Sequence, residues 1–195
     1  MSTGTGRRVS PRPNAGHGTN EVIIATDAAP KVRRAARVVL VDGQGRVLLF
    51  RHEDSHNDPH WQPPGGGLEA GETFKEAALR EVAEELGRTD IVVGPMVWEW
   101  EHDFYYGSRL VRQYERAFLA LTDRLELGEG LESAHAADGI VDHRWWDREA
   151  LASCDTDVWP PELPVLIQDL AGRDPSRAPL RLPFRAARPR ATLNR

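Results

Sequence analysis

The stretch GGLEAGETFKEAALREVAEELG, which occupies residues 66–87, decides the fold of this chain. It places Glu81, Glu84 and Glu85 three and four residues apart, and side chains at these spacings project from one side of a helix. Like charges so placed destabilise an isolated helix by about 0.2–0.5 kcal/mol per pair. A hard divalent cation removes this repulsion, because Mg²⁺ and Ca²⁺ bind carboxylate oxygens. The stretch therefore predicts a helix built around a metal ion, and its leading glycines indicate chemistry on phosphates.

The limits of this helix follow from its flanking residues. Thr73 and Glu76 form a capping box, which predicts that the helix begins at Phe74. Gly87 is a natural left-handed stop, so the helix is expected to end at Leu86.

One side of the helix is apolar. At about 100° per residue, a stripe is formed by Phe74, Ala78, Leu79, Val82 and Leu86. Glu81 and Glu85 fall at the margin of this stripe, and Glu84 lies a step further round. Carboxylates at the margin of a core are held rigidly and can still reach a cleft, whereas a merely solvated helix would carry them on the opposite side.

The residues in and around this helix resemble the Nudix box, G-x5-E-x7-R-E-U-x-E-E-x-G-U, in which U is a bulky apolar residue. The matching positions are Gly66, Glu72, Arg80, Glu81, Val82, Glu84, Glu85 and Gly87. The last position of the box carries Arg88, where an apolar residue is usual. Since this position packs the exit of the helix, we interpret Arg88 as a packing variation that leaves the function intact. The resemblance implies a Nudix hydrolase: an α/β fold, the α/β/α sandwich with a mixed sheet and a central catalytic helix.

The resemblance also implies roles for the residues before the helix. Gly65, Gly66 and Gly67 would form a loop whose backbone approaches a pyrophosphate, which only glycine permits so closely. The carbonyl of Gly65 would bind metal. Arg80 and Glu72 are expected to pair and to fix this loop against the helix, so that Arg80 serves as a scaffold residue.

The same resemblance makes the three glutamates the centre of catalysis. Glu81 and Glu85 are the first choices as metal ligands, followed by Glu84. The expected cofactor is Mg²⁺, with Mn²⁺ as a substitute. The expected reaction is hydrolysis of a phosphoanhydride bond in a nucleoside diphosphate linked to another group, with divalent ions bridging phosphate oxygens.

The general base is left open by the sequence. A glutamate of the box can activate water, and some members of the family recruit an acid outside it. The candidates outside the box are Glu115, Glu129, Glu132 and Asp138. Glu115 lies on an expected strand and could equally pair with Arg112 or Arg116.

Substrate choice rests on residues downstream of the box. Tyr105 and Tyr106 stand at the spacing of a tyrosine in the diadenosine-polyphosphate branch, and Asp103 replaces a proline of the ADP-ribose branch. A nucleotide or dinucleoside polyphosphate is therefore favoured over ADP-ribose or a nucleotide sugar. The side chains that could stack a base are Trp98, Trp100, Phe104 and Tyr105. The residues interpreted as polar loop histidines are His52, His56, His60 and His102.

Two other functions fit the sequence less well. A Nudix-like domain that senses a nucleotide without hydrolysing it usually lacks a box glutamate or carries a DNA-binding domain, and neither feature is present in the sequence. Isomerisation of isoprenoid diphosphates uses a cysteine in the site, and Cys154 lies far towards the C-terminus.

The rest of the chain predicts a mixed sheet and two further helices. The expected strands are residues 37–41, 46–51, 91–101, 110–121 and 140–146, and the expected helices are residues 147–151 and 162–170. Asp42-Gly43-Gln44-Gly45 indicates a hairpin, and residues 126–138 are expected to form a long loop. The Nudix domain is placed at residues 32–172. It is flanked by a mostly disordered N-terminal tail, residues 1–31, with an optional edge strand at 21–26, and by an Arg/Pro-rich tail, residues 173–195.

Composition excludes several classes of protein. The chain has 195 residues, of which 40% are hydrophobic, and no stretch approaches the roughly 18 apolar residues of a membrane span. Its only cysteine, Cys154, excludes an internal disulfide, so a reducing, cytoplasmic location is expected. The net charge is −5 although both ends are rich in arginine, which leaves an acidic middle that argues against specific nucleic-acid binding. The expected partner is a small nucleotide-type substrate, and a homodimer is left open.

Overall fold

The computed structural model describes Met1 and residues 29–53, 58–170, 174 and 176–187. The strands are β1 (Lys31–Asp42), β2 (Val47–His52), β3 (His60–Gln62), β4 (Met96–Tyr106), β5 (Arg109–Thr122), β6 (Ile140–Trp146), β7 (Asp157–Val158) and β8 (Leu180–Arg181). The helices are α1 (Phe74–Leu86), α2 (Glu132–Ala137), α3 (Arg148–Ala152) and α4 (Leu163–Leu166), and a 3₁₀ turn (Ile167–Asp169) follows α4.

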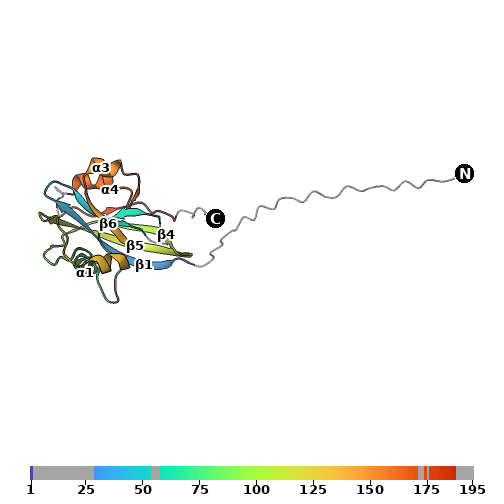
Figure 1. Ribbon diagram of the computed structural model, residues 1–195, viewed down its shortest axis with the longest axis horizontal. Coiled ribbons are helices and arrows are strands. Elements are labelled where there is room, and N and C mark those ends of the chain that lie inside the picture. The colour runs from blue at the N-terminus through green and yellow to red at the C-terminus, as the bar shows by residue number, and fades with distance from the viewer. Residues whose placement is uncertain (2–28, 54–57, 171–173, 175, 188–195) are drawn as a thin grey trace.

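The strands form one mixed sheet between two helical layers. Their order is β7-β3-β2-β1-β5-β4-β8, and β6 pairs with β2. Helix α1 covers one face of the sheet, and α3 and α4 lie on the other (Figure 1). The expected α/β/α sandwich with a mixed sheet and a central helix is therefore confirmed.

Strand β1 holds the two layers together, because its alternate residues enter separate cores. Val39 and Val41 pack with the residues under α3 and α4, whereas Val38 and Leu40 pack with α1. A strand buried on both faces is typically a continuous apolar run, as in this stretch. β1 also pairs in parallel with β5 along its whole length. The hairpin expected between β1 and β2 is present, and the Asp42 side chain accepts from the backbone N–H of Gln44 and Arg46.

Helix α1 has the limits that the sequence predicts. Thr73 and Glu76 form the capping box, and Gly87 ends the helix with φ 63°. The predicted apolar stripe is wrong at Leu79, which is 44% exposed, whereas Ala77 is fully buried. The buried face is rotated away from Leu79 and towards Ala77, and for this reason it takes in Glu81 and Glu85.

Arg88, two residues after the end of α1, is buried as expected for a residue that packs against the end of the helix, but its contacts are polar. Its guanidinium donates to the Asp90 carboxylate at 2.7 and 3.0 Å, to Thr122 Oγ1 at 3.2 Å and to the Arg124 carbonyl at 2.9 Å. Arg88 thus ties the end of α1 to the end of β5, with hydrogen bonds in place of apolar packing.

Several elements differ from the predictions at their ends. β4 begins at Met96 rather than residue 91, because Pro95 has no N–H for the ladder. β4 and β5 continue further than expected because Gly107, with φ 63°, turns the chain tightly between them. The predicted loop 126–138 contains α2, and the predicted helix 162–170 is a short α-helix followed by a 3₁₀ turn.

The N-terminal expectations fall almost entirely outside the described residues. This holds for the tail at residues 1–31 and for its optional edge strand at 21–26, although Lys31 already belongs to β1. Among the described helices, none is long and apolar enough to cross a bilayer.

The predicted C-terminal tail, residues 173–195, is wrong in part, because residues 180–185 join the sheet. β8 pairs in parallel with β4, and Leu182 is buried in the core that lies under α3 and α4. The Trp100 indole N–H donates to the Pro183 carbonyl at 3.0 Å. The segment thus presents Leu182 to the core, while Arg181 stays outside and Arg185 lies at the cleft.

This docking leads to a stability prediction. Leu182→Ala should lower the free energy of unfolding by about 2–4 kcal/mol, because it removes a buried side chain from the core. The matched control is Leu180→Ala, since Leu180 is 38% exposed and lies two residues away in the same segment. Thermal unfolding of both variants measures the difference, and equal melting temperatures would show that the segment is not docked.

Candidate active site

The glycine turn, residues Gly65–Gly67, lies against the edge of β1. Ala36 N–H donates to the Gly66 carbonyl at 2.9 Å, and Leu68 N–H donates to the Arg34 carbonyl at 3.1 Å. The backbone and the helix are so close here that a Cβ on Gly66 would overlap the carboxylate of Glu81. The turn therefore presents bare backbone directly to the glutamates of α1.

Two of the three predicted glutamates face this turn. The Glu85 carboxylate accepts from Gly65 N–H at 2.7 Å, and Glu85 and Glu81 are 2% and 8% exposed. Burial raises the pKa of Glu85 to about 8; the Arg37 guanidinium opposes this and the negative charge of Glu81 adds to it. Burial also raises the pKa of Glu81, against the effect of Arg80. Two buried carboxylates one turn apart, both resisting ionisation, form an oxygen donor set that fits a hard divalent cation.

Glu84, the third predicted ligand, lies on the solvent side. Its side chain is 54% exposed and accepts from Arg80 Nη1 at 2.9 Å. Within the described residues, no three His, Cys, Asp or Glu side chains are gathered so as to hold a metal ion by themselves.

Arg80 holds the turn to the helix, as predicted. It donates to both carboxylate oxygens of Glu72 at 2.9 and 3.1 Å and to the Gly67 carbonyl at 2.9 Å. It also pairs with Glu81 at 2.9 Å. The hydrogen bonds that Arg80 donates to Glu72, and those that it donates to Glu81 and Glu84, raise the pKa of Arg80. The predicted Arg80–Glu72 pair is therefore present, and Arg80 connects Glu72 and the Gly67 carbonyl of the turn to Glu81 and Glu84 of the helix.

Arg37 of β1 is a central residue that the sequence did not reveal. It donates to the carbonyl of Gly65, the predicted metal ligand, and pairs with Glu115 at 3.3 Å. A carbonyl oxygen has two lone pairs, so this bond is compatible with a second contact of the Gly65 carbonyl.

The predicted alternatives for Glu115, pairing with Arg112 or Arg116, are wrong. Arg112 holds Asp103 with two bonds at 2.8 and 2.9 Å, and Arg116 lies over the Phe74 ring at 4.5 Å. Successive side chains of a strand point to opposite faces, so residues 112 and 116 of β5 cannot share a face with residue 115. Glu115 instead accepts from Gln113 at 3.0 Å, besides its pair with Arg37.

A polar row crosses the sheet beside these residues. Arg33 of β1, Gln113 of β5 and His102 of β4 are in register; Arg33 donates to the Gln113 side chain, whose amide lies 3.3 Å from His102 Nε2. His102 is 2% exposed, and burial lowers its pKa to about 4, so it is neutral at pH 7. The interpretation of His52, His60 and His102 as loop residues is wrong, since all three belong to strands and His52 and His102 are buried there, whereas His56 lies outside the described residues.

These groups line one cavity of about 720 Å³, within the range of small-molecule sites. The predicted site residues that line it are Gly65, Gly66, Gly67, Glu81, Glu85 and Tyr105. The cations on its wall are Lys31, Arg33, Arg37, Arg109 and Arg185, and its acids besides the glutamates are Asp58, Asp103, Asp138 and Asp157. The cavity thus combines carboxylates for a cation with guanidinium groups for phosphates.

Other predicted residues divide between the cavity and the core. Of the candidate acids outside the box, Asp138 lines the cavity, whereas Glu129 and Glu132 are not among its lining residues. Phe104 lines it with Tyr105, but the prediction for Trp98 and Trp100 is wrong, since both are buried in the core. Trp159, which the sequence did not single out, supplies an aromatic wall instead and lies 5.2 Å from His102, ring centre to ring centre.

Comparison with protein families matches residues 31–168 to the NUDIX domain. The chain belongs to the Nudix family. One relative of this Nudix protein, an RNA pyrophosphohydrolase of Erythrobacter litoralis, is 31% identical over 147 residues, which are 70% of this chain and 82% of that protein. Another, an RNA pyrophosphohydrolase of Dinoroseobacter shibae, is 50% identical over 60 residues, only 31% of this chain and 37% of that protein. The expected class, a Nudix-type pyrophosphohydrolase, agrees with these names.

Solved structures share the Nudix fold. A MutT protein from Methanosarcina mazei has a TM-score of 0.57 at 18% identity, covering 74% of this chain and 96% of that one. The dihydroneopterin triphosphate pyrophosphohydrolase of E. coli has a TM-score of 0.54 at 21% identity, covering 71% of this chain and 95% of that one.

Proposed function

We propose that this Nudix protein is a divalent-metal-dependent hydrolase of nucleoside polyphosphates. The observation that carries the proposal is the pair of buried carboxylates, Glu81 and Glu85, which lie directly against the glycine turn and line one cavity with it. Free backbone at the turn can approach a phosphate chain, and Arg33 and Arg37 on the same wall can bind its oxygens. Few other reactions use a cation site and a phosphate site so close together.

Glu81 and Glu85 would hold the cation, which we expect to be Mg²⁺ or Mn²⁺, and the Gly65 carbonyl and Glu84 are further candidates. When bound, the cation neutralises negative charge that develops on the phosphates. The protein orients the phosphate chain through the glycine turn, which Arg80 and Arg37 fix in position. A carboxylate that faces the cavity, Glu81, Glu85 or Asp138, is positioned to accept the proton of the attacking water.

The substrate is proposed to carry three or more phosphates on a nucleoside. Tyr105 on the wall and the names of the relatives support this class, which includes nucleoside triphosphates, dinucleoside polyphosphates and RNA with a 5′-triphosphate. Asp103 stands in place of the proline of the ADP-ribose branch, but its charge does not by itself disfavour ADP-ribose, because Arg112 offsets that charge.

Hydrolysis is favoured over nucleotide sensing, because every glutamate of the box is present and two of them are buried at the turn.

The test of the proposed function is phosphate or pyrophosphate release from ATP, diadenosine tetraphosphate, a 5′-triphosphorylated RNA and ADP-ribose, each with Mg²⁺ or Mn²⁺. Hydrolysis of one of the first three is expected to have the highest kcat/KM. Binding of these compounds without release of any product would support the sensing alternative.

Tyr105 gives a prediction about specificity. Tyr105→Ala should lower kcat/KM for the preferred polyphosphate by about tenfold, the order expected when a base loses an aromatic stacking partner. The control is Tyr114→Ala, because Tyr114 is 41% exposed on β5 and does not line the cavity. The same kinetic assay is used for both variants, and an equal effect of the two would refute a specific role for Tyr105.

A further inference from the structure

The C-terminal segment, residues 180–186, lies beyond the part of the chain that matches the family, yet it borders the cavity. Its backbone follows the outer edge of β4: Leu182 N–H donates to the Glu99 carbonyl at 3.0 Å, and Asp103 N–H donates to the Arg185 carbonyl at 2.8 Å. Arg185 N–H donates in turn to the Glu101 carbonyl at 3.3 Å. The two hydrogen bonds made by the N–H and the carbonyl of Arg185 fix its backbone against β4.

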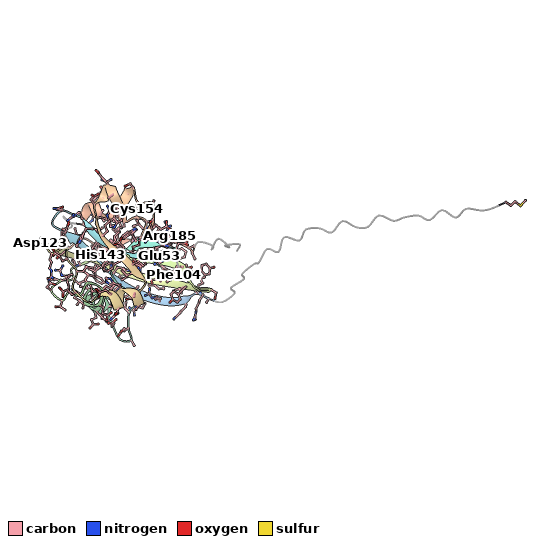
Figure 2. All side chains as sticks on the ribbon, in the orientation of Figure 1. Glu53, Phe104, Asp123, His143, Cys154 and Arg185 are labelled. Carbon is pink, nitrogen blue, oxygen red and sulfur yellow. The ribbon has the colours of Figure 1, made fainter. Side chains whose placement is uncertain are left out.

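The register of the sheet fixes which way Arg185 faces. Arg185 forms a parallel bridge with His102, which is paired with Gln113, which is paired with Arg33. Residues opposite one another on neighbouring strands point to the same face. All four side chains line the cavity, so the polar row has a guanidinium group at each end (Arg185 is labelled in Figure 2).

The two ends of this row lie far apart. The glycine turn is bridged to β1 through Gly67 and Ala35, whereas Arg185 is bridged to β4. Three strand spacings separate β1 from the C-terminal segment, about 14 Å along the sheet at about 4.8 Å per spacing. A pyrophosphate at the turn cannot reach that far, but the remainder of a nucleotide can.

A guanidinium group at this place suits a phosphate. Arginine binds phosphate oxygens through two parallel N–H bonds. Asp103, the acid next to His102 on β4, is already held by Arg112, and its charge is thereby offset. The other arginine of the segment behaves differently: Arg181 is exposed and pairs with Glu99 at 2.6 Å.

On the basis of the proposed function, we propose that Arg185 is a substrate-binding residue that holds a phosphate group of the substrate at the end of the cavity opposite the glycine turn. Its contact is distant from Glu81 and Glu85, so it is made equally in the ground state and in the transition state. Such uniform binding lowers KM without changing kcat.

The test compares Arg185→Ala, Arg185→Lys and Arg181→Ala in the full-length chain. The substrates are ATP and the dinucleotide pppApG. Besides its 5′-triphosphate, pppApG carries one phosphate between its two nucleosides, the internucleoside phosphate. Arg185→Ala should raise KM about tenfold or more for at least one of them, with kcat within about twofold of wild type. Arg185→Lys should restore part of the affinity, and Arg181→Ala should behave as wild type. A larger increase in KM for pppApG than for ATP assigns the contact to the internucleoside phosphate, and an equal increase for both assigns it to the triphosphate.

A second measurement separates this inference from the proposed function. ATP and pppApG are titrated into wild type and Arg185→Ala in EDTA, which prevents turnover, and binding is followed by tryptophan fluorescence. Arg185→Ala should bind at least one of the two compounds more weakly than wild type does. This binding result can be obtained even if wild type hydrolyses neither compound, an outcome that would count against the hydrolase proposal and not against the contact of Arg185. A purely structural role of Arg185 would lower the melting temperature and leave KM and binding unchanged, and that result overturns the inference.

Discussion

Glu85→Gln is expected to lower kcat by about 10²–10³-fold, the order seen when one preorganised group that stabilises transition-state charge is removed. Glutamine keeps the shape of the side chain and can still accept from Gly65 N–H, which donates to Glu85 at 2.7 Å. It cannot supply the negative charge that a cation requires. The loss should therefore appear in the chemical step.

The same substitution should not unfold the protein. The pKa of Glu85 is raised to about 8 in the fold, so between the ordinary pKa of a glutamate and about pH 8 the folded state binds a proton that the unfolded state has lost. Stability from this group is therefore lost as pH rises through that window. Glutamine resembles the protonated form, and in EDTA at pH 8 the variant should melt at the same temperature as wild type or higher.

Glu126→Gln is the control for Glu85→Gln, because Glu126 is an exposed acid outside the cavity. Steady-state kinetics at saturating Mg²⁺ and thermal unfolding in EDTA are measured for both variants. Turnover of Glu85→Gln close to that of wild type would exclude Glu85 as a metal ligand. A large fall in melting temperature would instead assign it a structural role.

The parts of the site that the sequence predicts are those encoded locally. The capping box, the stop at Gly87 and the pairing of Arg80 with Glu72 depend on residues within about two helical turns of each other, so spacing alone predicts them. Even within this helix, the predicted apolar stripe is wrong at Leu79, which is exposed. The helical angle gives the width of a stripe, but the packing partners on β1 and β2 determine its centre.

The residues that the sequence missed come together through strand register. Arg37 reaches Gly65 and Glu115 from a different strand, and nothing near Arg37 in the sequence indicates either contact. His102 could have been recognised, because alternation in β4 puts it on one face with Trp100 and Phe104. A similar signal was present at the C-terminus, where alternating arginine and leucine precede Pro183. Its arginine-rich composition led to the prediction of a tail.

Gly65→Ala is expected to have the largest effect on stability. Gly65 has φ 133°, a backbone conformation that an L side chain rarely adopts, and a Cβ there would overlap the Ala36 carbonyl and lie 2.9 Å from Arg37 Cα. Both neighbours are backbone atoms of a buried strand, so no side chain can move aside. Strain of about 1–3 kcal/mol and overpacking of about 1–3 kcal/mol should add, and the melting temperature should fall by about 10 °C.

Gly71→Ala separates the two causes. Gly71 also has a positive φ, 89°, but a Cβ there would meet nothing within 4 Å. It therefore shares the backbone strain, about 1–2 kcal/mol, without the overlap. Thermal unfolding of both variants should give the larger loss for Gly65→Ala, and the displaced Gly65 N–H should also weaken the hold on Glu85 and lower kcat. If the two variants lose equal stability, the turn is not pressed against β1, and a phosphate site built on that close approach would have to be abandoned.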